Sequence, residues 1–262
     1  MGIETNLPDE MNKDEPEENR QRVELLKVPI DITAPEQLSS VIYDLLNEKK
    51  EHNIILLSLW DLLKARRNSE YRSYVKNASL VIPISKSLIS GIKFLTGKKA
   101  YRYMPLDFIQ RMLYILDKRE YSCYLLGGRR KILIKTEQNI RQTYPKLHVV
   151  GRFPGYFKRH EESIVIKAIK KSSPSLLLVG KGIRGNERWI ARNNKTLGEG
   201  MRLWCSDIFD IFAEKKRPPS RTIFKYGLEW IGYCFQNPFK LFRIFPYIRY
   251  KFLLLFYKLF VK

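Results

Sequence analysis

Residues 122–150, SCYLLGGRRKILIKTEQNIRQTYPKLHVV, hold the pattern that decides the fold. A short apolar run at 122–126 ends in two glycines, a helical pattern covers 131–144, and a second apolar run covers 147–150. Short apolar runs of this kind are typical of strands that are buried on both faces, as in parallel sheets. A strand, a helix and a second strand in this order predict a parallel βαβ unit.

The same alternation continues on both sides of this unit. Further strand-like runs lie at 54–58, 80–83 and 176–179, and further helical patterns lie at 34–46, 107–116 and 161–171. The chain has 262 residues, of which 44% are hydrophobic, so it can bury a sizeable core. We therefore expect an α/β protein with a largely parallel sheet.

Charge is unevenly distributed along the chain. The formal net charge is +21, which favours an anionic partner such as phosphate, nucleic acid or an anionic bilayer. Residues 1–22 hold seven acids and three bases with almost no large apolar residues, and we expect a disordered acidic arm there. The expected organisation is that arm, a core domain over 23–220 and a basic aromatic appendage over 221–262.

The last 25 residues, 238–262, have a composition suited to a lipid headgroup layer. They contain six Lys or Arg, nine Phe or Tyr and no acid. Aromatic rings and basic side chains that alternate in this way fit the boundary of an anionic bilayer. The other interpretations are an amphipathic helix docked on the protein's own core and, less favoured, a nucleic-acid surface. No run of about 18 apolar residues occurs, so we expect no membrane-spanning helix.

Cysteine and histidine usage argues against disulfides and metal. Cys123, Cys205 and Cys234 are too few and too scattered for a disulfide framework or a zinc site. The three histidines lack metal-binding spacings. The acidic start of the chain has no apolar stretch of the kind found in signal peptides. We expect a protein of a reducing compartment, with no metal and no other cofactor.

Two predicted strand ends carry candidate binding residues, because parallel sheets bind ligands beyond the carboxyl ends of their strands. Gly127 and Gly128 follow one strand and would let backbone N–H groups approach a phosphate, although tight turns use such pairs too. Gly180 and Gly182 follow another strand, just before a helix that opens near Glu187. Glu187 could equally be a first-turn partner of the helix dipole.

Several motifs in a fixed order resemble the WecG/TagA/CpsF glycosyltransferases, family 26, from Val28 to Tyr247. The matching segments are Leu80-Val81-Ile82-Pro83, Arg102 with Asp107, Leu125-Leu126-Gly127-Gly128, Tyr144-Pro145, Gly155-Tyr156-Phe157, Val179-Gly180-Lys181-Gly182, Glu187-Arg188-Trp189-Ile190, Phe209-Asp210, Arg217-Pro218-Pro219, Gly227-Leu228-Glu229-Trp230 and Pro238. Each piece is weak alone, and the ordered set is specific.

The resemblance implies a Rossmann-like core and a membrane-associated C-terminal appendage. It implies inverting transfer of an N-acetylmannosamine-type sugar from a UDP-sugar to a polyprenyl-diphosphate-linked sugar. The reaction would take place in the cytoplasm, at the inner face of the bacterial plasma membrane, in cell-surface polysaccharide synthesis. Because the family includes oligomers, homo-oligomers are among the states to expect. A nucleic-acid-binding module is disfavoured, since it would leave the ordered motifs without a purpose.

The sequence differs from the family pattern at positions that correspond to the family's catalytic and substrate-binding residues. The family's catalytic Asp, in Pro-Asp-Gly, is Ile84 here, and Ile84 cannot accept a proton. The family's Pro-Lys-Gln-Glu segment corresponds to Arg184-Gly185-Asn186-Glu187 in this chain. Glu187 keeps the carboxylate of the family's Glu, and Asn186 keeps the amide of its Gln. Two hypotheses follow: an active site rebuilt for a different donor or acceptor, with Lys86, Asp107 or Glu187 as the ionisable group, or a non-catalytic scaffold or regulator on the same fold.

The remaining candidates are binding residues. Asn186 and Glu187 would contact sugar or ribose hydroxyls, and Asp210 would do the same or cap a helix. Arg217 and Arg243 would bind diphosphate, because a planar guanidinium donates two hydrogen bonds at once. Surface solvation is the alternative role for both arginines, and helix N-capping is the alternative for Asp107.

Overall fold

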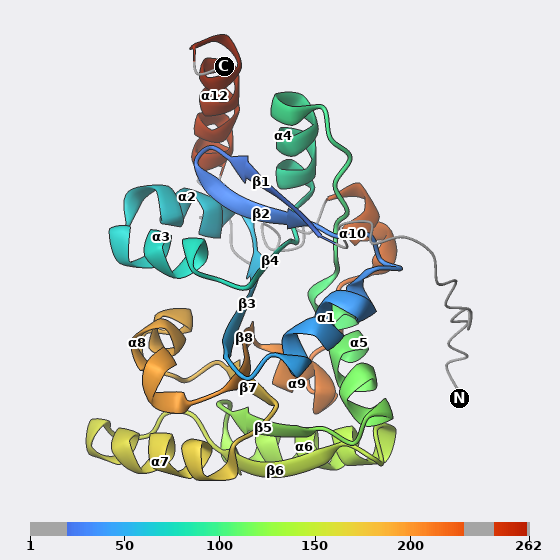
Figure 1. Ribbon diagram of the computed structural model, residues 1–262, viewed down its shortest axis with the longest axis vertical. Coiled ribbons are helices and arrows are strands. Elements are labelled where there is room, and N and C mark those ends of the chain that lie inside the picture. The colour runs from blue at the N-terminus through green and yellow to red at the C-terminus, as the bar shows by residue number, and fades with distance from the viewer. Residues whose placement is uncertain (1–19, 228–243, 261–262) are drawn as a thin grey trace.

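A six-stranded parallel sheet forms the centre of the protein, as the alternation of strands and helices predicts (Figure 1). The structure is a computed structural model that describes residues 20–227 and 244–260. The strand order is β4-β3-β8-β7-β5-β6, and every neighbouring pair is parallel. The strands are β3 (Glu51–Leu57), β4 (Leu80–Pro83), β5 (Ser122–Leu126), β6 (His148–Phe153), β7 (Leu176–Gly180) and β8 (Gly200–Ser206).

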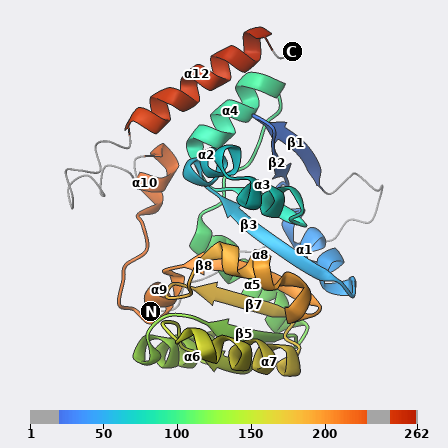
Figure 2. The ribbon, with the colours of Figure 1, turned by 90° about the vertical axis from the view of Figure 1, so that its left-hand side faces the viewer.

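Helices cover both faces of this sheet (Figures 1 and 2). One face carries α1 (Leu38–Asn47), α5 (Pro105–Lys118), α6 (Arg130–Thr143) and α9 (Ile208–Phe212). The other carries α2 (Leu59–Arg67), α3 (Ser69–Lys76), α7 (Glu162–Ser172), preceded by the short η1 (Arg159–Glu161), and α8 (Glu187–Leu197). The fold class predicted from the sequence, a Rossmann-like α/β domain, is confirmed.

Two hydrophobic cores result from the alternation of side chains along each strand. In β7, Leu176 and Leu178 pack against the α1 and α5 side, whereas Leu177 and Val179 pack against the α8 side. Strands buried on both faces need apolar side chains at every position, which is why they are uninterrupted apolar runs in the sequence. The central strands are therefore buried on both faces.

A β-hairpin of β1 (Gln21–Leu25) and β2 (Val28–Ile32) packs beside β4 (Figure 1). The buried carboxylate of Asp31 fixes it, accepting 2.8 Å bonds from Nε and Nη2 of Arg22 and a 2.7 Å bond from the backbone N–H of Val81. The arm predicted over 1–22 therefore overlaps the structured domain by two residues, because β1 begins at Gln21. Residues 1–19 lie outside the described part of the chain.

The described end of the chain is a long helix, α12 (Ile244–Phe260), which lies beside α4 (Lys86–Thr96) (Figure 2). Tyr250 is fully buried, and its hydroxyl donates a 2.8 Å hydrogen bond to the carbonyl of Ser87. Lys258 donates a 3.1 Å bond to the carbonyl of Phe94. Within residues 20–227 and 244–260, no helix has the length and hydropathy needed to cross a membrane.

Candidate active site

A cavity of about 310 Å³ opens at the carboxyl ends of β3 and β8. Open parallel sheets bind their ligands at this edge. The walls come from β3, α2, α3, β8 and the loops after β4 and β8, with Glu187 from α8. The polar or ionisable lining residues are Ser58, Asp61, Tyr71, Tyr74, Glu187, Trp204, Cys205, Ser206 and Asp207. The lining also includes Ile84, the position at which the family resemblance leads us to expect an acid.

Asp61 lies in the first turn of α2, directly beyond β3. The hydroxyl of Ser58 caps α2 and accepts a hydrogen bond from the backbone N–H of Asp61. In return, Oδ2 of Asp61 accepts a 3.0 Å bond from the backbone N–H of Ser58 and a 2.5 Å bond from its hydroxyl. This reciprocal capping box fixes the carboxylate at the cavity wall.

The pKa of Asp61 is raised above its ordinary value. Burial is the main cause, and the negative charge of Glu187 adds to it. The two hydrogen bonds from Ser58 and the charge of Lys64 act in the opposite direction. The Asp61 carboxylate therefore has a greater affinity for a proton than an exposed aspartate has.

Glu187 also lines the cavity, as expected from its place after a strand end. It is largely buried in the first turn of α8 and pairs with Lys64 of α2. The ammonium of Lys64 also lies 4.2 Å from the ring centre of Tyr71. Asn186 precedes Glu187 and is exposed, with a backbone φ of 52°.

Two tyrosines of α3 complete the wall. The hydroxyl of Tyr74 is buried and has no hydrogen-bond partner among the residues that the structure describes. Burial raises the pKa of both Tyr71 and Tyr74, so their hydroxyls stay protonated and are able to donate. A buried hydroxyl without a partner, in a cavity wall, is a place where a ligand oxygen can bind.

Lys86 and Asp107, the two candidate catalytic groups, both face α10 (Arg221–Tyr226), and neither lines the cavity. Lys86 donates a 3.3 Å hydrogen bond to the carbonyl of Tyr226. Asp107 is half-exposed and lies 4.0 Å from a guanidinium nitrogen of Arg221. In this structure both residues lie next to the start of the predicted appendage, and their catalytic roles remain predictions.

Arg102 ties the same helix to the strand end beside the cavity. Its Nε donates a 2.8 Å hydrogen bond to the carbonyl of Ile84, and its Nη1 donates to the carbonyl of Phe224. Its guanidinium also lies 3.6 Å from the ring centre of Phe224. The main chain at position 84 is thus fixed from outside the cavity.

The predicted glycine turns pack the ends of β5, β6 and β7 together. The N–H of Gly127 donates to the carbonyl of Phe153 at 2.9 Å, and that of Gly128 donates to the carbonyl of Lys181 at 2.7 Å. Gly180 and Gly182 lie against the rings of Phe209 and Tyr156, where an added methyl group would approach to 2.6 Å. The N–H groups of the first two glycines thus bond within the protein, and diphosphate binding by any of the four remains a prediction.

Replacing Gly127 with Ala is expected to lower the free energy of unfolding by about 2 kcal/mol. Gly127 has a φ of 122°, and a methyl group there would approach the carbonyl of Gly180 to 2.8 Å. Gly97→Ala is the matched control, because Gly97 has a φ of 73° with nothing within 4 Å, and should cost about 1 kcal/mol. Urea unfolding of both variants measures the difference. Equal losses would contradict a packing role for Gly127.

Two further predicted binding residues, Asp210 and Arg217, are not among the residues that line this cavity. Asp210 is buried in α9 and pairs with Lys181, so its charge is already compensated. Arg217 is exposed in the segment between α9 and α10. Arg243 lies outside the described residues. The structure leaves the proposed ligand contacts of all three as predictions.

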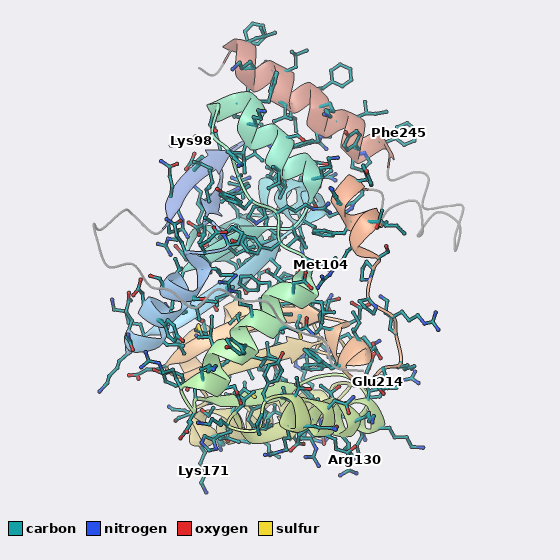
Figure 3. The ribbon with its side chains drawn as sticks, turned by 90° about the vertical axis from the view of Figure 1, so that its right-hand side faces the viewer. Lys98, Met104, Arg130, Lys171, Glu214 and Phe245 are labelled. Atoms are coloured by element: carbon teal, nitrogen blue, oxygen red, sulfur yellow. The ribbon has the colours of Figure 1, made fainter. Side chains whose placement is uncertain are left out.

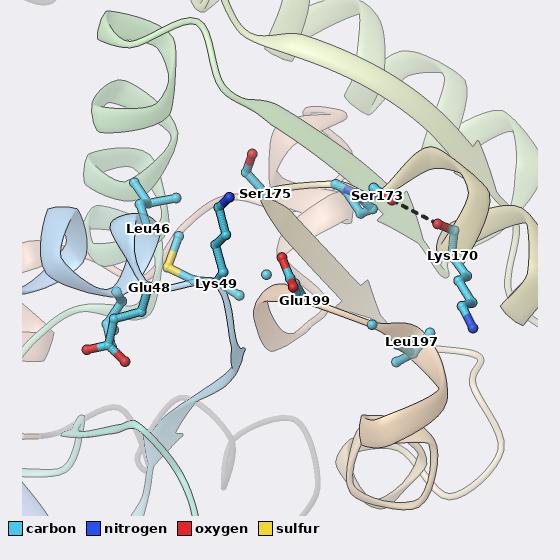
Figure 4. Close-up of a pocket in the computed structure, with 13 residues that line it drawn as sticks. Leu46, Glu48, Lys49, Lys170, Ser173, Ser175, Leu197 and Glu199 are labelled. Carbon is cyan, nitrogen blue, oxygen red and sulfur yellow. Dashed lines mark hydrogen bonds between the residues drawn. The ribbon is translucent and has the colours of Figure 1, made fainter.

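A second cavity, also of about 310 Å³, lies at the opposite edge of the sheet (Figure 4). Lys49, Ser175 and Glu199 are among its lining residues, and they lie near the amino ends of β3, β7 and β8. None of the residues that the sequence marks as candidates lines it. Because ligands of such sheets bind at their carboxyl edge, the first cavity is the candidate active site.

Sequence reasoning missed Asp61, Tyr71, Tyr74 and Asp207. A signal for Asp61 was present, because Ser58 and Asp61 have the spacing of a capping box directly after a predicted strand. The tyrosines carry no comparable signal, since their approach to the cavity depends on how α3 packs.

The fold and cavity define a Rossmann-like α/β protein with its site at the carboxyl edge of a parallel sheet. A family model described as "Glycosyl transferase WecG/TagA/CpsF family" matches residues 23–262, and the chain belongs to that family.

Two similar proteins carry the name N-acetylglucosaminyldiphosphoundecaprenol N-acetyl-beta-D-mannosaminyltransferase. The one from Bacillus spizizenii is 22% identical over 176 residues, which is 67% of each chain. The one from Staphylococcus aureus (strain NCTC 8325 / PS 47) is 21% identical over 215 residues, which is 81% of this chain and 84% of that protein. The family resemblance drawn from the sequence motifs is confirmed.

Proposed function

We propose that this protein transfers an N-acetylhexosamine of the N-acetylmannosamine type from a UDP-sugar to a polyprenyl-diphosphate-linked sugar, with inversion. The observation that carries the proposal is the cavity at the carboxyl edge in a chain of this family. Carboxylates at Asp61, Glu187 and Asp207 line it and can accept hydrogen bonds from sugar hydroxyls. The names of the relatives, which specify a lipid-diphosphate-linked acceptor, support the acceptor class.

The transfer we propose is a direct displacement at the anomeric carbon, with UDP as the leaving group and no metal ion. Backbone N–H groups and arginines, including Arg217 and Arg243, would stabilise the leaving diphosphate. Among the described residues, no group of three or more His, Cys, Asp or Glu is arranged to hold a metal. The expected result is turnover that persists in EDTA, and loss of turnover on chelation would contradict it.

The second candidate function is a non-catalytic scaffold or regulator. Ile84 favours it, because an alkyl side chain lies in the cavity at the position where the family has its catalytic acid. A scaffold of this kind would bind a nucleotide sugar or a partner enzyme without turnover.

We also propose that the protein acts at the inner face of the bacterial plasma membrane, held there by α12. Large apolar side chains are exposed along the outer face of this helix: Phe245, Tyr247, Ile248, Phe252, Leu255, Phe256, Leu259 and Phe260. Figure 3 shows the α12 side chains that extend away from α4, with Phe245 labelled near the start of the helix. The exposed bases Arg249 and Lys251 lie on the same helix and suit anionic headgroups.

The test is UDP release in vesicles that carry lipid-diphosphate-linked GlcNAc, using a panel of UDP-N-acetylhexosamines. We expect the wild-type protein to turn over at least one donor. The Ile84→Asp variant restores an acid to the cavity wall and serves as the comparison. Donor binding without wild-type turnover, together with turnover by Ile84→Asp, would instead support the scaffold.

A further inference from the structure

The wall that contains Ile84 and the first turn of α2 form one surface of the cavity. The backbone N–H of Ile84 donates a 3.0 Å hydrogen bond to the carbonyl of Leu57, at the end of the neighbouring strand. The backbone N–H of Leu59 donates a 3.1 Å bond to the hydroxyl of Ser85. These two bonds fasten the end of β4 to the start of α2, so Ile84 and Asp61 line the same space.

Asp61 differs from the two other carboxylates in this cavity. Glu187 pairs with Lys64, and Asp207 pairs with Lys216. Asp61 has no salt bridge within residues 20–227 and 244–260. Its carboxylate accepts hydrogen bonds from the N–H and the hydroxyl of Ser58, and it also interacts with the hydroxyl of Tyr71. Both Ser58 bonds reach Oδ2, so an acceptor hydroxyl would approach this carboxylate from the cavity, beside Tyr71.

The groups around Asp61 suit proton transfer. The charged neighbours that shift its pKa are Glu187 from α8, which raises it, and Lys64 from α2, which lowers it, with burial as the largest cause. From α3, Tyr71 and the unpartnered hydroxyl of Tyr74 line the same cavity. Asp207 contributes the remaining carboxylate from the loop after β8. A general base is most effective when its pKa lies nearer to the working pH than that of an exposed carboxylate.

We propose that Asp61 is the general base of the transfer and that the hydroxyl of Tyr74 hydrogen-bonds a substrate oxygen beside it. This assignment rests on the proposed function. The acceptor hydroxyl gives its proton to the Asp61 carboxylate while its oxygen forms a bond to the anomeric carbon. The bond from that carbon to the diphosphate oxygen breaks, and its electron pair leaves with UDP. The active site is thus complete without an acid at position 84.

The test compares steady-state UDP release by the wild type, Asp61→Asn and Asp61→Asn/Ile84→Asp across a range of pH. The asparagine keeps an oxygen that can accept from the N–H of Ser58 but cannot take a proton. We expect kcat to fall roughly 10²- to 10⁴-fold with KM little changed. Wild-type kcat should fall as the pH drops through the raised pKa of Asp61, and this acidic limb should vanish in Asp61→Asn. The double variant should recover part of the lost kcat.

Glu161→Gln is the matched control, because Glu161 is also the third residue of a capping box, accepts from the N–H of Lys158 at 2.7 Å and lies outside the cavity. Its kcat should stay at the wild-type value. If Asp61→Asn fails to fold by circular dichroism, Asp61→Glu replaces it. Glutamate suits the capping box, so a purely structural role predicts an unchanged kcat and pH profile, whereas a general base moved by one methylene predicts a change in both.

The outcomes separate this assignment from the proposed function. Wild-type turnover with a folded Asp61→Asn variant of equal kcat would overturn the role of Asp61 and leave the transferase intact. Absence of wild-type turnover with every donor of the panel would overturn the transfer function and the base together. Loss of kcat with an unchanged acidic limb would show that Asp61 acts through the position of α2 and not as the base.

Discussion

Exchanging both Phe252 and Phe256 for glutamate is expected to weaken binding to anionic vesicles more than a hundredfold. These rings are 69% and 53% exposed on the outer face of α12, so the substitutions remove little of the protein's own packing. Transfer of a phenylalanine side chain out of water is worth about 1.5–3 kcal/mol, and two of them give at least about 3 kcal/mol. The added acids also meet the negative surface of the bilayer. Vesicle sedimentation measures the partition coefficient directly.

Ile164→Glu is the control for this experiment. Ile164 is 61% exposed on α7, which lies at the far end of the molecule from α12 (Figure 1). This variant tests whether loss of an exposed apolar residue elsewhere on the surface also weakens vesicle binding. We expect its partition coefficient to equal that of the wild type. Removal of residues 238–262 should release the protein altogether. Wild-type binding by the double variant would show that α12 is not the membrane contact.

Asp31→Ala is expected to lower the free energy of unfolding by about 2–4 kcal/mol. The carboxylate is 1% exposed and accepts from Arg22 and from the backbone N–H of Val81. Because the side chain of Arg22 is 34% exposed, it can return to water, and the main loss comes from the buried N–H. A loss of about 3 kcal/mol would lower Tm by roughly 10 °C for a chain of this size.

Glu24→Ala is the comparison for Asp31→Ala. Glu24 lies on β1 of the same hairpin, and its side chain is exposed. Exposed substitutions of this kind usually change stability by less than about 0.5 kcal/mol. Guanidinium unfolding of the two variants should separate them clearly. Equal stability of Asp31→Ala and the wild type would show that the hairpin does not depend on this carboxylate.

Strands that are apolar throughout could be predicted from the sequence, and a strand that carries a buried charge could not. Residues 80–83 and 122–126 were expected as strands and form β4 and β5 with the same bounds. The central strand β8 was missed because Arg202 interrupts its apolar run. Arg202 is buried and donates to Asn194 Oδ1 at 2.5 Å and to the carbonyl of Gly198. These partners come from α8 and its C-terminal turn, which become neighbours of β8 after folding.

The residues of the candidate site also differ in whether the sequence could indicate them. Glu187 could be placed in the cavity because it follows a strand end. Lys86 follows a strand end and Asp107 lies in the first turn of the next long helix, yet both face α10, whose position depends on tertiary packing. The buried hydroxyl of Tyr74 lies on a helix away from every strand end, so no local pattern could indicate it.

The way position 84 is held has an evolutionary consequence. Its N–H is bound to Leu57 and its carbonyl to Arg102, so both anchors are main-chain atoms that every residue type except proline provides. Selection can therefore exchange the side chain at 84 without disturbing the framework around it.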